Sequence, residues 1–384
     1  MATATKDTPT LKATIPLARL AWALGIAGPA VPSRPSLPSL SNVLITIDDG
    51  RMVVRATDLD VAVEAALDVP AGPSGVACVP AKLLTELVGA LSGETVDLIG
   101  TAHGGMRVGS GTNGAVLKGI DTDQFPPAWS APSSGPRATI RMPADTLHAA
   151  LKRVAVAAAK EDSRPVLAGV LFRVQDGSLA LAAADGFRLA SQRLEVADVQ
   201  ADGIVDAIIP ARSCKLIEQA LKGHGDGEAV LTVYPAYAHL AAGPVGIAVR
   251  LIEGQFPNYE AIIPSADQPH VIRVHAGDLR RALRIVAPFA KDAANIVRLD
   301  AGEHALTLTS TSADVGEGTA EVAANREGEA VSWALNAAYL ADALDAIDGP
   351  VRFALAGPTY PVLLTPDGKQ DYSHTVMPMH YVKE

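Results

Sequence analysis

Side chains that could perform catalysis or bind a metal occur along this chain, but they lack the spacing that such chemistry requires. The nine histidines include no HxH or HxxxH pair, and neither a CxxC nor a GxSxG motif is present. Paired aspartates at Asp58 and Asp60, and at Asp121 and Asp123, would suit a hard metal ion. The first pair follows a predicted strand at a position that recurs twice, which favours a turn. The residues therefore predict no catalytic centre, no metal site and no cofactor.

A glycine-rich segment at 109–114, GSGTNG, matches the GxGxxG pattern of dinucleotide-binding loops. In that role the loop must precede a helix whose N-terminus faces the pyrophosphate. Here the flanking segments, MRV and AVLKG, are short and strand-like, and no helix pattern follows. We therefore interpret the segment as a β-hairpin turn.

The elements around these residues recur three times. Equivalent strands end at Asp58, Asp185 and Asp314, which are spaced by 127 (185 − 58) and 129 (314 − 185) residues. A helical block recurs as VPAKLLTELVGAL from Val79, IPARSCKLIEQAL from Ile209 and LNAAYLADALDAI from Leu335. A period of about 128 residues is the size of a domain and far exceeds that of solenoid repeats. The chain therefore contains one domain three times.

Domain boundaries are predicted at 10–130, 138–265 and 270–384, and polar linker residues such as SAPSSGPR follow the first domain. Each domain has the order strand, helix, hairpin, strand, second helix and another set of strands. Consecutive strands are joined by hairpins, which favours antiparallel sheets. The predicted fold class is α+β, with two helices per domain packed on antiparallel sheets.

Composition is that of a globular protein, with 48% hydrophobic and 19% charged residues and a net charge of −10. The acidic balance argues against a uniformly basic surface for nucleic acid, although not against a local one. Cys78 and Cys214 stand in unrelated contexts, which suggests a reducing compartment without disulfides. The apolar run from Leu20 to Val31 is interrupted by Gly and Pro and has internal counterparts, so we interpret it as a structural helix. We expect a soluble, cytoplasmic protein that does not contact membranes.

Two equivalent helices carry basic residues beside their apolar stripes. The predicted buried stripes are Leu279, Leu283, Val286 and Ala290 in the third domain and Leu147, Leu151, Val154 and Ala158 in the second. The basic residues are Arg280, Arg284 and Lys291 in the third domain and Lys152, Arg153 and Lys160 in the second. One such face would be an ordinary solvated surface. Its recurrence in an acidic protein favours a track for phosphates.

Several segments together resemble the bacterial DNA sliding clamps, the β subunit of the replicative DNA polymerase III holoenzyme. They are SRPSLPSLSNVLI in the first domain, SRPVLAGVLF, ADGFRLA and LIEGQFPNYEAIIP in the second, and LNAAYLADAL, YPVLLTP and VMPM in the third. The resemblance extends from about Thr14 to Met379. Arg-Pro-x-Leu, FPxY and the final MPM, in this order within a threefold repeat, are specific in combination.

The resemblance implies a ring. In clamps, two protomers close head to tail into six domains, whose inner helices line the hole and whose sheets lie outside. DNA threads through without being read, and the ring acts as a processivity factor that makes and breaks no bond. Implied partners are double-stranded DNA, a second copy of the chain, the polymerase III α subunit, the clamp loader, other polymerases, DNA ligase and mismatch-repair proteins.

The resemblance also implies three sets of functional residues. Positions that match DNA contacts, together with the basic helix residues, are Arg34, Lys82, Lys152, Lys160, Arg164, Arg212, Arg280 and Arg284. Positions that match the dimer interface are Pro288 and Phe289, with Ala115 where a bulkier residue can occur. Positions that match a pocket for partner peptides are Leu167, Gly186, Phe187, Arg188, Leu189, Pro257, Ile262, Asn336, Tyr339, Pro361, Val362, Val376, Met377, Pro378 and Met379.

The pocket residues suit apolar peptide anchors, because Met and Leu adapt to varied shapes, while Arg188 and Asn336 would fix a polar end. Leu167, Leu189 and Val376 would equally serve as plain core residues. His380 and Tyr381 stand where the family often ends in Arg-Leu, and three further residues follow. Two alternatives remain open at this point: a specialised clamp paralogue, for example an inhibitor-resistant duplicate, and an enzyme on an α+β scaffold.

Overall fold

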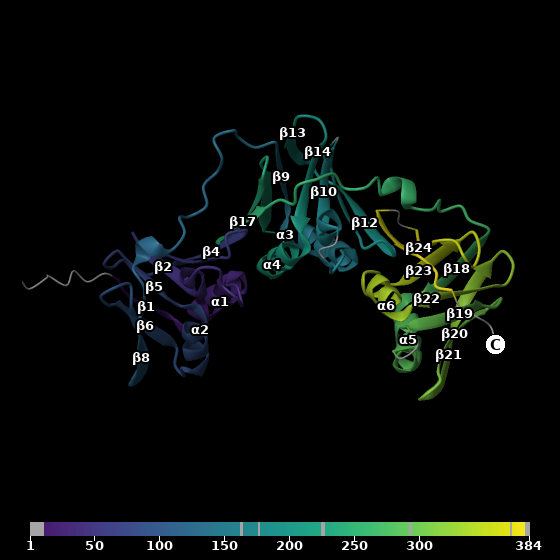
Figure 1. The fold of residues 1–384 in the computed structure, drawn as a ribbon, viewed down its shortest axis with the longest axis horizontal. Helices are drawn as coiled ribbons and strands as arrows, with labels where there is room; N and C mark the ends of the chain where they lie inside the picture. Colours follow the sequence, from purple (N-terminus) through teal and green to yellow (C-terminus); the bar gives the residue numbers. More distant parts are fainter. Residues whose placement is uncertain are drawn as a thin grey trace, which may run out of the picture. The chain divides into compact units, whose positions relative to one another are not determined.

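The computed structural model describes residues 11–161, 164–175, 177–223, 227–291, 294–368 and 371–380. Asp176, which falls in a predicted hairpin turn, and the terminal residues Tyr381 to Glu384 lie outside these ranges. In the described part the same series of elements occurs three times along the chain (Figure 1). This repetition confirms the three α+β domains predicted from the sequence.

The first third opens with a strand and a helix, continues with four strands and a second helix, and ends with three strands. Its elements are β1 (Lys12–Pro16), α1 (Leu17–Ala27), β2 (Asn42–Asp48), β3 (Arg51–Thr57), β4 (Val61–Asp68), β5 (Gly75–Pro80), α2 (Ala81–Ala90), β6 (Thr95–Gly100), β7 (Met106–Ser110) and β8 (Asn113–Leu117). The β7–β8 hairpin contains the glycine-rich segment, with Ser110 facing Asn113 across the turn. The hairpin interpretation of that segment is confirmed.

The second third repeats the series with one extra short strand, β13. Its elements are β9 (Ala138–Pro143), α3 (Ala144–Val154), β10 (Gly169–Gln175), β11 (Ser178–Ala184), β12 (Arg188–Glu195), β13 (Asp198–Ala201), β14 (Val205–Pro210), α4 (Ala211–Leu221), β15 (Glu228–Val233), β16 (Tyr237–Ala242) and β17 (Val245–Arg250). The predicted stripe of Leu147, Leu151 and Val154 is buried on α3. Ala158 is buried too, but it lies beyond α3, after a 3₁₀ turn at Ala155–Ala157, so placing it on this helix was wrong.

The last third consists of β18 (His270–His275), α5 (Ala276–Ala290), β19 (Ile296–Ala301), β20 (Ala305–Ser312), β21 (Gly316–Glu327), β22 (Val331–Asn336), α6 (Ala337–Asp345), β23 (Pro350–Leu355), β24 (Val362–Pro366) and β25 (Tyr372–Val376). The predicted stripe of α5 is buried in full. Helices α5 and α6 lie side by side (Figure 1). The helices of this third start at residues that cap them with side chains: His275 accepts from Gly277 N–H, and Asn336 accepts from the N–H groups of α6.

The chain forms two compact units, and their border falls inside the second third. One unit comprises the described residues up to 148 with 198–202 and 215–251; the other comprises 149–197, 203–214 and the described residues from 252 on. The first contains a nine-stranded sheet, β13-β9-β15-β16-β17-β4-β3-β2-β5, and a four-stranded sheet, β1-β6-β7-β8. The second contains a twelve-stranded sheet, β14-β10-β11-β12-β25-β24-β23-β18-β21-β20-β19-β22. The boundaries 10–130, 138–265 and 270–384 stay a prediction from the repeat.

This division has a physical cause. In the first unit β17 pairs with β4 of the first third, and in the second unit β12 pairs with β25 of the last third. Each ladder continues a sheet from one third of the chain into the next, so hydrogen bonds and packing cross the sequence boundaries. A compact unit therefore follows the sheets and not the repeat.

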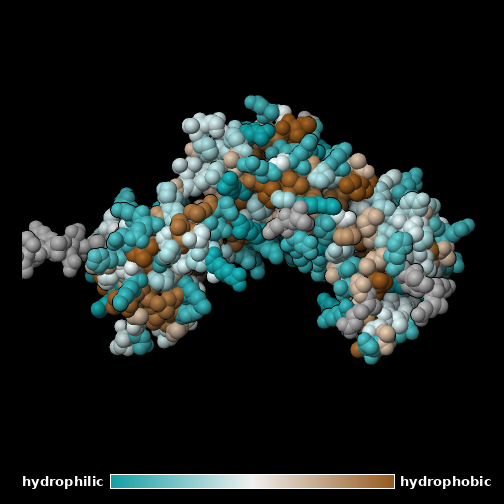
Figure 2. All heavy atoms as spheres, viewed as in Figure 1, coloured by the Kyte–Doolittle hydropathy of each residue, from teal (hydrophilic) through white to brown (hydrophobic). Residues whose placement is uncertain are grey.

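The outside of the molecule is largely hydrophilic on the face shown in Figure 2, where apolar groups are scattered among polar ones. The apolar run from Leu20 belongs to α1 only as far as Ala27; Gly28–Ala30 forms a 3₁₀ turn, and Val31 lies beyond it, so extending one helix to Val31 was wrong. In the described part of the chain, no helix has both the length and the apolar character needed to span a bilayer. Exposed large apolar side chains include Leu59, Phe187, Tyr360 and Met377.

Candidate functional site

The turn between β11 and β12 is organised by the strand-end aspartate. The Asp185 carboxylate accepts from the N–H groups of Phe187 at 2.9 Å and Arg188 at 3.0 Å. Gly186 between them has φ of +94°, a conformation that glycine adopts without steric cost. The turn leaves the Phe187 side chain 64% exposed. Asp185 therefore places an apolar ring at the surface and directs Arg188 inward.

The equivalent turn of the first third has the same hydrogen bonds. Asp58 accepts from the N–H groups of Asp60 at 3.0 Å and Val61 at 2.7 Å. No group of three or more His, Cys, Asp or Glu side chains able to hold a metal occurs among the residues the structure describes. The turn interpretation of Asp58 is confirmed.

Arg188 is buried, with its residue surface 5% exposed. Its Nε donates to Asp185 Oδ2 at 3.0 Å, and its Nη1 donates to Asp342 Oδ2 at 2.5 Å. Its Nη2 donates to the carbonyl oxygen of Val156 at 2.5 Å. A buried charge is costly unless it is paired and hydrogen-bonded, and these partners meet that requirement. Asp342 was not among the residues singled out from the sequence.

Helix α6 supplies the opposite wall. Asn336 Oδ1 accepts from the N–H groups of Ala338 at 2.9 Å and Tyr339 at 3.3 Å, which caps the helix. The Tyr339 ring lies 4.3 Å from the guanidinium carbon of Arg188, within the range of a cation–π contact. Burial, followed by the nearby Asp185 charge, raises the pKa of Tyr339. The ring is therefore neutral and held in place by the cap and the guanidinium.

Beneath the turn lies an apolar core that ties in the linker after β17. Leu167, Leu171 and Leu189 pack with Phe256 and Tyr259 of that linker. In the same sheet, Arg173 of β10 forms a bidentate pair with Asp206 of β14, in which Nε and Nη2 each donate to a carboxylate oxygen at 2.8 Å. Because Phe256 and Tyr259 of the FPxY segment are buried in this core, they fix the linker to the sheet.

The residues after β25 run beside the turn. Met377 N–H donates to the Phe187 carbonyl at 2.8 Å, and Met379 N–H donates to Ala334 at 2.8 Å. Met377 is 41% exposed, whereas Val376 is fully buried. The backbone past β25 thus holds the backbone of Phe187 in the turn.

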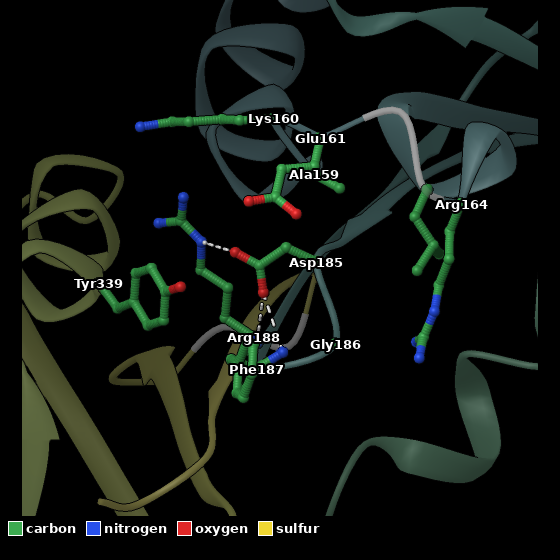
Figure 3. A pocket seen from close by; sticks show the side chains of 10 residues that line it. Ala159, Lys160, Glu161, Arg164, Asp185, Gly186, Phe187, Arg188 and Tyr339 are labelled. Carbon is green, nitrogen blue, oxygen red and sulfur yellow. Dashed lines mark hydrogen bonds and ion pairs between the residues drawn. The ribbon is translucent and has the colours of Figure 1, made fainter.

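These elements enclose a hollow of about 490 Å³ within the second unit (Figure 3). Of the predicted pocket residues it contains Leu167, Gly186, Phe187, Arg188 and Tyr339. In Figure 3 the Arg188 guanidinium lies between the Asp185 carboxylate and the Tyr339 ring, while Arg164 extends on the other side of the turn.

The remaining predicted pocket residues do not line this hollow. Leu189, Val362 and Val376 belong to the buried core. Those outside it with at least part of their surface accessible are Pro257, Ile262, Asn336, Pro361, Met377, Pro378 and Met379.

Four residues of the hollow were not predicted as pocket residues from the sequence but contribute charge: Lys160, Glu161, Arg164 and Asp185. Lys160 and Arg164 were predicted as DNA contacts instead. Asp185 carried a usable signal, because an aspartate ends the equivalent strand in each third of the chain. Glu161 carried none that sequence reasoning recognised.

The predicted DNA-contacting residues occur in both units. Arg34, Lys152, Lys160, Arg164, Arg212 and Arg284 are exposed. The Lys82 side chain is 90% exposed and lies 3.9 Å from Glu86. Arg280 differs, because its side chain is only 27% exposed and donates to the Leu344 carbonyl at 3.1 Å and to Asp345 at 3.5 Å. Arg280 therefore also holds the end of α6.

The predicted interface residues lie on two elements. Ala115 is half-buried in β8, and Pro288 lies exposed within α5. A Cβ on Gly318 would come within 2.4 Å of the Phe289 ring, so this ring covers the backbone of β21. Phe289 thereby links α5 to one strand edge.

Comparison with known proteins decides the family. Three family profiles match the chain in succession: the DNA polymerase III beta subunit N-terminal domain at 11–128, its central domain at 141–258 and its C-terminal domain at 260–380. This chain belongs to the bacterial DNA sliding clamps. The family is one of non-catalytic processivity factors, so the chain is not an enzyme, as the sequence predicted.

Individual clamps are similar along almost their whole length. The beta sliding clamp of Synechococcus elongatus is 29% identical over 363 residues, covering 93% of this chain and 96% of that protein. The beta sliding clamp of Streptomyces coelicolor is 27% identical, with 94% and 96% covered. The crystal structure of a sliding clamp from Bartonella birtlesii has a TM-score of 0.88 at 25% identity and covers 97% of this chain and all of that one.

Proposed function

We propose that two copies of this chain close head to tail into a ring around double-stranded DNA, and that this ring slides and tethers the replicative polymerase. Tethering converts repeated bimolecular encounters into an effectively intramolecular one. Retention on DNA then rests on topology, while contacts with phosphates stay weak and interchangeable. The compartment for this function is the cytoplasm, where a bacterial chromosome is replicated.

The proposed ring closure is supported by two strand edges that lack a neighbouring strand within the described ranges. The last strand of the second third, β17, pairs with β4, and the last strand of the final third, β25, pairs with β12. By position, β8 corresponds to β17 and β25, and β21 corresponds to β4 and β12. Within the described ranges, β8 pairs only with β7, and Gly316–Ala323 of β21 pairs only with β20. Open edges favour pairing with another chain, so β8 of one copy joins β21 of its partner.

The predicted interface residues agree with this arrangement. Ala115 lies in β8, and Phe289 packs on Gly318 of β21. Pro288 is exposed beside Phe289. A C2 dimer built from two such contacts satisfies both open edges at once.

The exposed basic residues supply the phosphate contacts. In this proposal Arg34, Lys82, Lys152, Lys160, Arg164, Arg212 and Arg284 face the duplex, while Arg280 contributes less because it holds Leu344 and Asp345. Neutralising one cation that binds a phosphate should lower the slope of log affinity against log salt by about one. A net charge of −10 on the whole chain limits attachment elsewhere.

The hollow at the β11–β12 turn is the proposed docking site for partner peptides. Exposed Phe187 offers apolar surface and Tyr339 forms a fixed wall of the hollow, while Ile262 and Met377 are exposed apolar residues outside it. The proposed ligands are short segments of the polymerase α subunit, the clamp loader, other polymerases, ligase and mismatch-repair proteins. A peptide of the form Gln-x-x-Leu-x-Phe should bind with a Kd of micromolar order, and deletion of residues 377–384 should abolish binding, because Met377 supports Phe187.

Retention on DNA tests the ring. Loaded with a clamp loader and ATP onto nicked circular DNA, the chain should remain bound and should be released when the circle is linearised. Val116→Lys is a sensitive variant, because Val116 is 57% exposed on β8 and an edge lysine opposes strand pairing. It should sediment as a monomer and be absent from both DNA forms. Equal retention of the unmodified chain on circular and linear DNA would refute the proposal.

A further inference from the structure

Each nitrogen of the Arg188 guanidinium already donates to an oxygen of the protein. Nε, Nη1 and Nη2 donate to Asp185, Asp342 and Val156 respectively, and the side chain is 3% exposed. The guanidinium thus lines the hollow while its positive charge is compensated by two carboxylates.

Asp342 is the partner that comes from the far wall. It lies 154 residues from Arg188 in the sequence and three residues after Tyr339 on α6. Residues three apart share one helix face, so Asp342 and Tyr339 approach the guanidinium together. Asp342 is 40% exposed, whereas the Asp185 side chain is 14% exposed. Of the two carboxylates, Asp342 is therefore the one nearer to solvent.

Charged side chains of both signs line the hollow, and the pairing of Arg188 with Asp342 affects their balance. The cations that line the hollow are Lys160, Arg164 and Arg188, and the anions are Glu161 and Asp185; Asp342 is not part of the lining but pairs with Arg188. Lys160 and Arg164 are exposed and screened by solvent, so they attract a ligand charge weakly. A buried guanidinium released from one carboxylate would attract such a charge far more strongly, because solvent does not screen it.

We propose that Asp342 is a positioning residue that holds Arg188 against Tyr339 and Asp185, so that the hollow selects peptides by their apolar anchors and not by negative charge. The inference rests on the proposed peptide-binding function. Asp342 touches no peptide itself; it acts by occupying the Nη1 donor of Arg188.

The test compares two peptides of the form Gln-x-x-Leu-x-Phe, one uncharged and one with a single added Glu, by calorimetric titration. The unmodified chain should bind both within about threefold of each other. Asp342→Asn keeps the size of the side chain but removes its charge, which should shift the ratio of the two Kd values by about tenfold toward the acidic peptide. Asp342→Glu restores a carboxylate and should return the ratio toward that of the unmodified chain.

Asp345 provides a matched control on the same helix. It pairs with Arg280 outside the hollow, so Asp345→Asn removes the same charge from α6 and should leave the ratio unchanged. Asp342→Ser offers a second way to remove the charge if Asn prevents folding, and the same shift is expected.

Three outcomes would overturn the inference. Equal weakening of both peptides by Asp342→Asn would mean that Asp342 only supports the fold. An equal shift in Asp345→Asn would assign the effect to overall helix charge. If the unmodified chain binds neither peptide but is still retained on circular DNA, the proposed peptide site is refuted and the proposed ring is not.

Discussion

The two ladders that join successive thirds of the chain have the same geometry and opposite chemistry. Between β4 and β17, Val61 faces Val249 and Val63 faces Ile247, and all four are buried. Between β12 and β25, Arg188 faces Val376, Gln192 faces Tyr372, and Ala190 faces His374. Each ladder has five residue pairs. The buried face of the first junction is therefore an apolar seam, while Glu64, opposite Gly246, lies partly exposed and pairs with Arg55. The other junction contains a buried polar network.

The difference assigns separate tasks to the two junctions. An apolar seam gains stability from burial in proportion to area and needs no exact partners. The polar junction requires particular geometry, and within the described residues Gln192 Oε1, His374 Nε2 and Thr375 Oγ1 find no hydrogen-bond partner. The polar junction is also the one beside the hollow. In a chain built from one repeated domain, apolar burial therefore stabilises one junction, and specific polar contacts hold the junction beside the hollow.

Removing the buried cation should have the largest effect. Arg188→Met removes the guanidinium that pairs with Asp185 and Asp342 and leaves the buried Asp185 charge with backbone N–H donors alone, so we expect a loss of about 3–5 kcal/mol in unfolding free energy. Val61 occupies the matching position in the apolar ladder, and Val61→Ala should cost only about 1.6 kcal/mol for two methyl groups. Urea unfolding followed by tryptophan fluorescence measures both. Equal losses would mean that the two junctions do not differ as described.

The apolar ladder should be sensitive to cavities. Ile247 is 1% exposed, and Ile247→Ala should cost about 2–5 kcal/mol because the space left behind cannot fully close. In the polar ladder, Ser191 and Ser373 share one hydrogen bond of 2.8 Å, and Ser373→Ala should cost about 1 kcal/mol. The same urea experiment distinguishes them; a smaller loss for Ile247→Ala than for Ser373→Ala would contradict the apolar-seam description.

Acid should weaken the polar junction through His374. Burial, with the charge of Arg188 adding to it, lowers the pKa of His374 to about 3, so His374 stays neutral in the folded chain. In the unfolded chain it takes up a proton near pH 6.5, so stability falls as pH drops from 6.5 toward 3, by about 1.4 kcal/mol per pH unit. His374→Gln removes this dependence. The difference between the two proteins should thus be constant above pH 7.5 and change steadily from pH 6 to pH 5; parallel curves throughout would exclude His374 as the cause.

The smallest effect should come from the two equivalent turns. Leu59 has φ of +80° where Gly186 has +94°, and a left-handed conformation costs an L side chain about 1–2 kcal/mol. Leu59→Gly should therefore raise stability by up to about 1 kcal/mol. Gly186→Ala should lower stability by about 1 kcal/mol, because alanine is strained at this positive φ. No steric clash adds to that cost, since within 4 Å the new Cβ meets only the Arg164 side chain, at 3.8 Å. Thermal unfolding should show a higher midpoint temperature for Leu59→Gly and a lower one for Gly186→Ala. A lower midpoint for both variants would show that the Leu59 side chain makes contacts that compensate for its strained backbone.

Much of this architecture was predictable because its signals are local. Helical periodicity marked the buried stripes of α3 and α5, and a recurring aspartate marked the turns at Asp58 and Asp185. Repetition along the chain predicted three α+β domains, and the family followed from the motifs within them. The prediction for Arg188 and Asn336 was less specific: both were expected to fix the polar end of a peptide. In the structure, Arg188 is paired internally and Asn336 caps α6.

The sequence by itself determined the repeated domain, its helices and strands, and the family to which the chain belongs, because each depends on neighbours within one element or one repeat. Only the tertiary structure decided where the compact units divide and which groups meet at the hollow. Asp342 and Arg188 are 154 residues apart, and the Val156 carbonyl has no side-chain signature at all. Partners of a long charged side chain are selected by packing between repeats, and no periodicity along the chain records that choice.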